Sequence, residues 1–199
     1  RWPFGPSYAV GMDTARNLIF LGSGGGIFIL DCSNPENLTY VSDIRTMGFV
    51  EDMYYDAGTQ RLYLANGPAG LEIWDVSDAT QPAKLGQYQI GGWAGYVTGV
   101  HVQGNYAYLA GGSLYIIDVS DPYNPQEVSS YSIDGYVNDV YVVDNYAYVT
   151  DRWYIRLLVV DISDVEQPQV IGQCGVNGAA VHRVWVANNY AYVCVWNLY

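Results

Sequence analysis

Residues 105–121 read Asn-Tyr-Ala-Tyr-Leu-Ala-Gly-Gly-Ser-Leu-Tyr-Ile-Ile-Asp-Val-Ser-Asp, and both ends of this stretch recur along the chain. The Asn-Tyr-Ala-Tyr end is repeated at 145–148 and 189–192. The Asp-x-Ser end occurs four times, and successive copies lie 43 or 44 residues apart, beginning at Asp31, Asp75, Asp118 and Asp161. A fixed period of this length indicates a chain built from structural repeats.

The third repeat predicts four β-strands and no helix. Two segments of alternating polarity, 100–102 and 106–110, are separated by Gly104-Asn105, a two-residue turn that is typical of hairpins. Segment 114–119 is almost continuously apolar, as is typical of a strand buried on both faces. After a turn with two prolines, segment 126–133 is more polar, which favours an outer edge strand.

The repeats together predict an all-β fold, a β-propeller of four-stranded antiparallel blades, with about four and a half blades in this chain. We expect a single domain over residues 1–199. Its blades are expected at approximately 8–44, 52–90, 97–133, 137–173 and, in part, 181–199. A solenoid is the competing architecture, but solenoid repeats usually carry fewer and shorter strands.

Two of the apolar segments carry a family resemblance. Residues 157–164 (Leu-Leu-Val-Val-Asp-Ile-Ser-Asp) and 114–122 (Leu-Tyr-Ile-Ile-Asp-Val-Ser-Asp-Pro) resemble the LVIVD repeat, and the preceding Tyr-Ala-Tyr-Val strand is similar to the same family. The resemblance covers nearly the whole chain. It implies a β-propeller, commonly in exported or surface-attached proteins of bacteria and archaea, mostly without an assigned reaction. The first copy departs from the pattern at 31–35, and the second has Ala79 in place of proline, but both keep the strand pattern.

Four full blades and half of a fifth leave the ring incomplete, whereas a propeller closes its ring, typically with four to eight blades. An open ring exposes sheet edges and apolar faces to water. Three interpretations remain open. The chain is a fragment of a longer one, or strands from another copy or a partner complete it, or the ring closes in a tight and irregular way.

Composition and charge exclude several classes of partner. The 20 acidic residues against 8 Lys and Arg give a formal net charge of −12, which argues against nucleic acid and anionic membrane surfaces. No apolar run approaches the roughly 20 residues that span a bilayer, so we expect no membrane insertion. The 20 Tyr and 6 Trp with a single lysine favour an extracellular or cell-surface location. Since residues 1–6 show no leader, an exported chain would be the mature form.

The three cysteines lack metal-binding spacing. Cys32 takes the place that Val or Ile has in the other Asp-x-Ser copies, so we expect a buried free thiol there. Cys174 and Cys194 are either bridged or free.

A site is expected at the channel mouth, where the connection into each blade and the loop after its second strand share one rim. Alignment of the first strands places one polar pair of each blade there. We predict that these pairs and four nearby aromatic residues bind a ligand: Glu51-Asp52, Thr98-Gly99, Asn138-Asp139, His182-Arg183, Trp93, Tyr96, Tyr136 and Trp153. The alternative is that polar residues merely line a water-filled channel.

Other chemistry has little support in the sequence. The Asp-x-Ser-Asp turns lack the order of a calcium loop, and short Asp and Ser side chains bond their own turn amides, so we expect no metal and no cofactor. His101 lies mid-strand and is expected to be packed or to face the channel. No catalytic residue is predicted, although a carboxylate pair for glycoside cleavage could be drawn from Glu51, Asp52 and Asp139.

Two functions follow from these observations. The first is a non-catalytic extracellular or cell-surface module for protein interaction or structure, with itself or a surface partner, which self-assembles through its incomplete blade. The second is a propeller that binds a glycan or another small ligand at the channel mouth, or a hydrolase with its site there.

Overall fold

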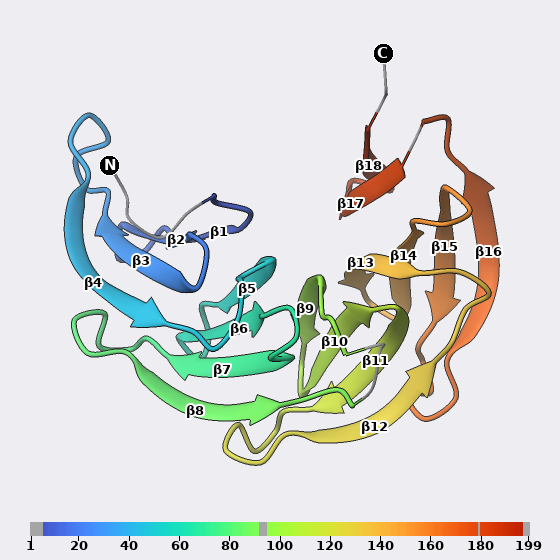
Figure 1. The fold of residues 1–199 in the computed structure, drawn as a ribbon, viewed down its shortest axis with the longest axis horizontal. Helices are drawn as coiled ribbons and strands as arrows, with labels where there is room; N and C mark the ends of the chain where they lie inside the picture. The colour runs from blue at the N-terminus through green and yellow to red at the C-terminus, as the bar shows by residue number, and fades with distance from the viewer. Residues whose placement is uncertain (1–5, 92–94, 179, 197–199) are drawn as a thin grey trace.

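The computed structural model describes residues 6–91, 95–178 and 180–196, and within these it contains strands and turns but no helix. Five antiparallel sheets stand side by side around a central channel, and the arc that they form is open between the first sheet and the last (Figure 1). Four sheets have four strands and the fifth has two, which confirms the predicted propeller of about four and a half blades. The described part of the chain offers no helix with the length and apolar character that crossing a membrane requires.

Each sheet is a meander in which neighbouring strands are consecutive in the chain. The first sheet consists of β1 (Val10–Asp13), β2 (Leu18–Gly22), β3 (Gly26–Asp31) and β4 (Thr39–Arg45). The second consists of β5 (Asp52–Asp56), β6 (Arg61–Ala65), β7 (Leu71–Asp75) and β8 (Ala83–Tyr88). The third consists of β9 (Gly99–Gln103), β10 (Tyr106–Gly111), β11 (Ser113–Asp118) and β12 (Gln126–Tyr131). The fourth consists of β13 (Val137–Val143), β14 (Tyr146–Asp151), β15 (Arg156–Asp161) and β16 (Gln169–Gly175), and the fifth of β17 (Ala180–Ala187) and β18 (Tyr190–Trp196).

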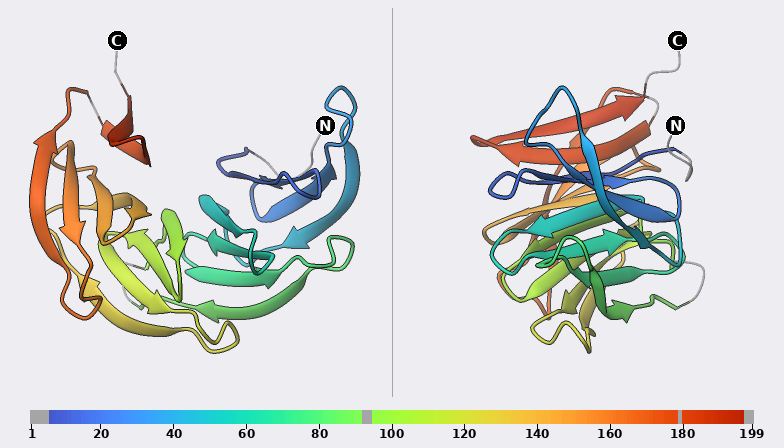
Figure 2. Two further views of the ribbon diagram at one scale, coloured as in Figure 1. Left: turned by 180° about the vertical axis from the view of Figure 1, so that it is seen from behind. Right: turned by 90° about the vertical axis from the view of Figure 1, so that its left-hand side faces the viewer.

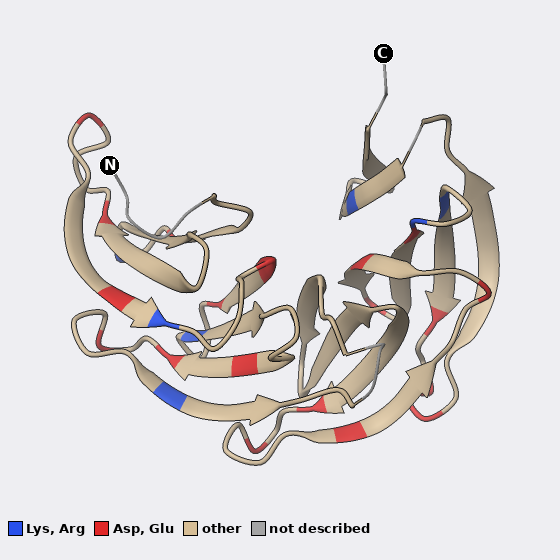
Figure 3. Cartoon of the chain, in the orientation of Figure 1, with Lys and Arg blue, Asp and Glu red and all other residues tan. Residues whose placement is uncertain are grey.

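The first strand of every blade lies at the channel, and the fourth lies on the outside of the arc (Figure 1). Consecutive first strands contact one another, from β1 to β5 and onward to β17. The view from behind shows the same arc, open between the first sheet and the last, and the side view shows the sheets edge-on (Figure 2). Acidic side chains are spread over all four complete blades, while basic ones are few (Figure 3).

Apolar side chains on facing sheets form the core. One cluster fills the space between each pair of consecutive complete blades. Between the third and fourth blades, for example, Ile116 and Val149 are both fully buried. Because middle strands contribute to a cluster on either side, their sequences are apolar at consecutive positions, as in the run 114–117 of β11, whose residues alternate between two clusters. Burial of each such side chain contributes about 1.5–3 kcal/mol.

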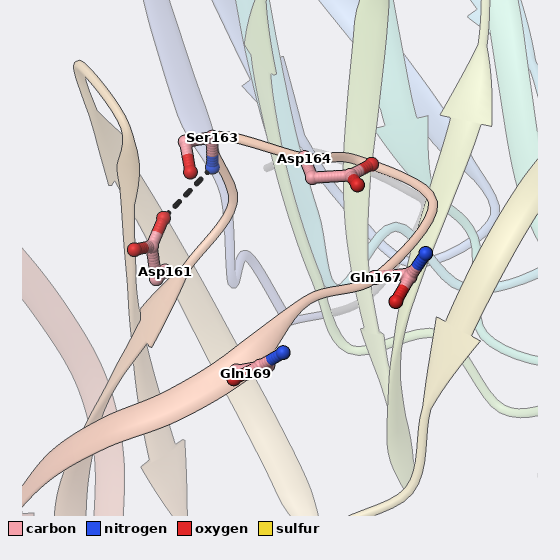
Figure 4. A pocket seen from close by; sticks show the side chains of 5 residues that line it. All are labelled: Asp161, Ser163, Asp164, Gln167 and Gln169. Carbon is pink, nitrogen blue, oxygen red and sulfur yellow. Dashed lines mark hydrogen bonds between the residues drawn. The ribbon is translucent and has the colours of Figure 1, made fainter.

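The four Asp-x-Ser turns have the conformation that the sequence predicted. In each, the aspartate carboxylate accepts a hydrogen bond of 2.7–2.9 Å from the amide of the serine two residues on. These bonds stabilise the charged carboxylate and lower the pKa of all four aspartates. Figure 4 shows the fourth turn, where Asp161 bonds Ser163 beside a pocket bordered by Gln167 and Gln169. The carboxylates therefore have a structural partner in their own turns.

The same turns fasten neighbouring blades together at the outer rim. Ser42 of β4 donates a hydrogen bond of 2.6 Å from its hydroxyl to the carbonyl of Ala79, in the turn of the next blade. Ser129 of β12 makes the equivalent bond of 2.5 Å to the carbonyl of Val165. In β8 the equivalent position is Gly86, whose backbone lies directly against the carbonyl of Pro122. The outer strands of the first three blades thus contact the turn of the following blade.

One expectation about the cysteines needs correction. Cys32 is free but only half-buried. Its counterparts Val76, Val119 and Ile162 are buried because each packs into the cluster shared with the preceding blade. Within the described residues no blade precedes the first, so nothing covers Cys32 in the same way. Cys174 and Cys194 are both exposed and free, so neither is bridged.

The outer-strand glycines provide a test of the rim contact. A Cβ at Gly86 would clash with the carbonyl of Pro122, which is backbone and cannot rotate away, whereas a Cβ at the equivalent Gly172 would lie 3.8 Å from Val159. We expect Gly86→Ala to destabilise the fold by about 1–3 kcal/mol and Gly172→Ala to be almost neutral. Urea unfolding of both variants measures this. Equal midpoints for the two variants would contradict the proposed rim contact.

Candidate functional site

The channel mouth contains a cavity of about 710 Å³ with contributions from all five blades. Six of the predicted residues line it, namely Glu51, Tyr96, Thr98, Asn138, His182 and Arg183. The four remaining lining residues were not predicted and are Tyr8, Arg152, Cys194 and Trp196.

The register of the first strands brings these side chains to one depth. Asp52, Gly99 and Asp139 each pair with the corresponding residue of the second strand, which is Ala65, Ala110 and Thr150 respectively. The residues just before them therefore meet at the mouth.

A connected row of hydrogen bonds runs along this rim, next to bulges in β13 and β17, which are the first strands of the fourth and fifth blades. β13 is irregular around Asn138, and β17 is irregular around His182. The Thr98 hydroxyl donates to the carbonyl of Asn138 at 2.7 Å, and the Asn138 amide donates to the carbonyl of His182 at 2.8 Å. The polar side chains of three blades are thereby held in fixed positions.

Arg183 forms the floor of the mouth cavity. Its Nη1 lies 3.2 Å from a carboxylate oxygen of Asp52 and 3.2 Å from one of Asp139. Nη1 also donates to the carbonyl of Thr98 at 3.2 Å, and Nη2 donates to the carbonyl of Glu51. One side chain of the fifth blade therefore contacts the second, third and fourth blades.

The two carboxylates beneath Arg183 are each held by one backbone amide as well. Val100 donates to Asp52 at 3.0 Å, and Val184 donates to Asp139 at 2.8 Å. Burial, together with the charge of Asp52, raises the pKa of Asp139 to about 7 despite the nearby guanidinium. Burial also raises the pKa of Asp52, while Arg183 opposes that rise. The pair thus holds its protons more tightly than ordinary aspartates do.

A second cavity of about 230 Å³ lies on the other side of Arg183, which lines both cavities. Its walls include Asp52, Asp139 and an aromatic row in which His101 lies between Tyr54 and Tyr141, at ring distances of 4.8 and 4.4 Å. Burial lowers the pKa of His101 to about 4, so this imidazole is neutral at neutral pH. The prediction that His101 is packed or faces the channel is confirmed.

Not all of the predicted residues reach the mouth. Asp52 and Asp139 line the inner cavity rather than the mouth, because neighbouring residues of a strand point to opposite sides and Arg183 lies between them and the opening. Tyr136 and Trp153 contact each other at a ring distance of 6.0 Å but do not line the mouth cavity. Trp93 lies outside the described residues.

The residues that the prediction missed have partial signals in the sequence. Arg152 lies in the loop after β14, which belongs to the predicted rim. Cys194 pairs with Arg183 in the hairpin of β17 and β18, so extending that hairpin places it at the mouth. Tyr8 and Trp196 lie on blades at opposite ends of the chain and have no such signal.

The mouth has a basic character that contrasts with the acidic chain. Its lining includes two arginines and, among the described residues, a single carboxylate, that of Glu51. Glu51 accepts a hydrogen bond of 2.5 Å from the hydroxyl of Tyr96. Arg152 is exposed, and no hydrogen-bond or ion-pair partner of its guanidinium is found within the described residues. Burial and both arginines lower the pKa of His182.

A metal site is not evident at the mouth or elsewhere in the described ranges. They contain no group of three or more His, Cys, Asp or Glu side chains placed to bind a metal ion.

The repeats identify the family of this chain. The family model described as the LVIVD repeat matches residues 62–90, 94–133, 134–176 and 178–199. Because these matches cover more than half of the sequence, the chain belongs to the LVIVD-repeat family, as its motifs predicted. Among curated proteins, none matches this chain in sequence.

Solved structures share the fold at low sequence identity. A functionally unknown protein from Desulfotomaculum acetoxidans has a TM-score of 0.77 at 9% identity, over 96% of this chain and 63% of its own. A periplasmic gluconolactonase from Pseudomonas aeruginosa has a TM-score of 0.77 at 11% identity, over 93% and 62%. A protein from Lactobacillus plantarum has a TM-score of 0.75 at 12% identity, over 94% and 63%. The chain therefore spans less than two thirds of the length of these proteins.

The buried carboxylates predict a distinctive dependence of stability on pH. The pKa of Asp139 is about 7 in the folded chain and about 3.9 when unfolded, so the folded chain binds more protons between these values. Its contribution to stability is complete below about pH 4 and is lost as the pH rises through about 7. We expect Asp139→Asn, which does not titrate, to show a flatter profile in this range by urea unfolding. Parallel profiles for the variant and the natural chain would be the contrary result.

Proposed function

We propose that this chain is an exported β-propeller module that binds a small, polyhydroxylated carboxylate, such as a sugar acid, in the cavity at the channel mouth. The observation that carries the proposal is the exposed guanidinium of Arg152, without a partner among the described residues, at a cavity of about 710 Å³. This volume falls in the range of about 300–1,000 Å³ that is usual for ligand pockets.

The polar lining supports an anionic ligand. A guanidinium offers a planar pair of donors that match a carboxylate, and an exposed arginine without a protein partner can rotate to meet it. Arg183 lies at the floor, where four contacts fix its position and Asp52 and Asp139 offset its charge. Arg152 is therefore the arginine of the lining whose charge is free to pair with an anion, although the chain as a whole has a formal charge of −12.

The aromatic lining supports a sugar-like ligand. Tyr8, Tyr96 and Trp196 border the cavity, and the ring of Trp196 lies 5.2 Å from that of His182. Aromatic rings give rigid surfaces with an apolar face, on which a sugar ring can stack. The carboxylate of Glu51 and the side chain of Asn138 offer acceptors for hydroxyl groups.

Binding is favoured over hydrolysis. Glycoside cleavage needs two carboxyl groups on either side of the bond that breaks. Asp52 and Asp139 are bonded to Arg183 and line the inner cavity, so Glu51 has no second carboxylate beside it in the described lining of the mouth.

One comparison lends some weight to export and to a sugar-derived ligand. A propeller of the same fold is named a periplasmic gluconolactonase. At 11% identity, however, that similarity establishes only a shared fold, so the proposed ligand class rests on the residues that line the cavity.

Isothermal titration calorimetry with glucuronate and glucose tests this proposal. We expect glucuronate to bind at least tenfold more tightly than glucose, because only the acid pairs with Arg152. Arg152→Gln should weaken glucuronate binding about tenfold or more, the usual effect of losing a charged hydrogen bond. Arg45→Gln is the matched control, since Arg45 is also exposed but does not line the cavity. Equal affinities for the two sugars, or equal losses in the two variants, would exclude the proposed ligand class.

An interaction module is the second candidate, and exposed apolar side chains favour it. They lie on the rim loops and on the fifth sheet, and they are Met47, Phe49, Trp153, Tyr154, Trp185, Tyr190 and Tyr192. β18 pairs only with β17 among the described strands, so its other edge can pair with a strand of a second copy.

Light scattering tests this candidate. A second copy on β18 gives a mass that is a multiple of 22.1 kDa, and Tyr192→Ser, on an exposed side chain of that strand, should shift the mass toward 22.1 kDa. A mass of 22.1 kDa at all concentrations would exclude self-association.

A further inference from the structure

Arg183 is shared by two carboxylates, one buried and one half-buried, which leaves the cluster with more negative than positive charge. Asp139 is only 3% exposed, and the side chain of Asp52 is 23% exposed. Both contact the same guanidinium nitrogen at 3.2 Å. A buried site does not retain an unbalanced charge without cost, and two carboxylates so close to each other disfavour double ionisation.

The other groups around this cluster do not balance it. Tyr54 and Tyr141 are phenols, and burial raises the pKa of Tyr54. His101 is neutral at neutral pH because burial lowers its pKa to about 4. On the mouth side, Glu51 adds a negative charge. Arg152 adds a positive one, but it is exposed and lines only the mouth cavity.

We propose that the Asp52–Arg183–Asp139 cluster makes ligand capture at the mouth proton-linked, so that an anionic ligand binds above Arg183 while one of the two carboxyls below it takes up a proton. This inference rests on the proposed function of the mouth and specifies its regulation.

The coupling follows from the position of Arg183 between the two cavities. With both carboxylates ionised, the cluster has a net charge of −1 and repels an anion at the mouth. With one carboxyl protonated, the cluster is neutral and no longer repels an anion that pairs with Arg152 at the opening. The ligand in turn repels the carboxylates and favours their protonation, because coupling between two binding events is reciprocal.

The direction of the effect can be stated. In the free chain the pKa of Asp139 is about 7, and an anion nearby raises it further. Below about pH 7 the carboxyl is protonated in both states and affinity is highest. Above that value the carboxyl must take up a proton from solution when the ligand binds, so the affinity for the ligand falls by up to about tenfold per pH unit. His182 also gains a proton more readily beside an anion. Because its pKa is lowered from 6.5, however, His182 takes up that proton at a lower pH than Asp139 does.

Calorimetry with glucuronate at about pH 7.5, in two buffers of different ionisation enthalpy, measures the protons taken up on binding. We expect up to one proton per ligand for the natural chain. Asp139→Asn should abolish this uptake and, because asparagine is neutral like the protonated acid, should bind glucuronate up to about tenfold more tightly at about pH 8. A merely structural role for Asp139 does not predict a gain in affinity. In His182→Gln the number of protons taken up per bound glucuronate should be unchanged at this pH, whatever the change in affinity, because the pKa of His182 is lowered from 6.5.

The possible outcomes are distinct. Glucuronate binding without proton uptake overturns the inference and leaves the proposed function standing. An affinity that depends on sodium or potassium and not on pH also overturns it, because a cation then balances the cluster. Absence of glucuronate binding at every pH overturns the proposed function.

The cluster can also be tested without ligand. Carboxyl carbon-13 resonances of the aspartates in the free chain report their pKa values directly. We expect one resonance to titrate near pH 7, and Asp52→Asn should lower its pKa by removing the neighbouring charge. If every aspartate titrates below about pH 5, the inference is wrong.

Discussion

The structure depends on the burial of apolar sheet faces between consecutive blades. A four-stranded sheet with apolar residues on both faces cannot be stable alone in water, and each blade here covers one face of the next. This stacking explains why the middle strands are apolar at consecutive positions and why the fourth strands are polar outside. It also explains why Asp-x-Ser turns recur: the second, third and fourth copies each present a buried aliphatic residue and a backbone carbonyl to the preceding blade.

The channel is a consequence of the same stacking. First strands that lie side by side in equal register bring one position of the second to fifth blades to a common depth. Side chains there are not covered by a neighbouring sheet, so they can be charged. In this chain the position is occupied by Asp52, Gly99, Asp139 and Arg183, and the glycine leaves room for the carboxylate of Asp139. One arginine then holds two carboxylates and divides the channel into an outer and an inner cavity.

The division gives the two cavities different characters. The outer one combines an arginine that has no partner among the described residues with aromatic rings and hydroxyl-accepting groups, which favours a sugar acid. The inner one combines buried carboxylates with a neutral aromatic row, which favours the uptake of protons. Because Arg183 lines both cavities, a charge in one cavity changes the electrostatic potential in the other. The exposed aromatic residues of the rim and of the fifth sheet lie outside this arrangement and favour contact with another protein surface.

The sequence by itself determined the class of fold, the order of the strands and the conformation of the Asp-x-Ser turns, because period, alternation and turn chemistry are local. It also determined that Glu51, Thr98, Asn138 and His182 share the mouth, since equal register follows from the repeat. Only the tertiary structure decided that Asp52 and Asp139 lie beneath Arg183, that Arg152 and Trp196 join the mouth, and that Cys32 is half-exposed. These facts depend on the length and direction of side chains that reach across several blades, and on which blade faces have a neighbour, neither of which a repeat pattern encodes.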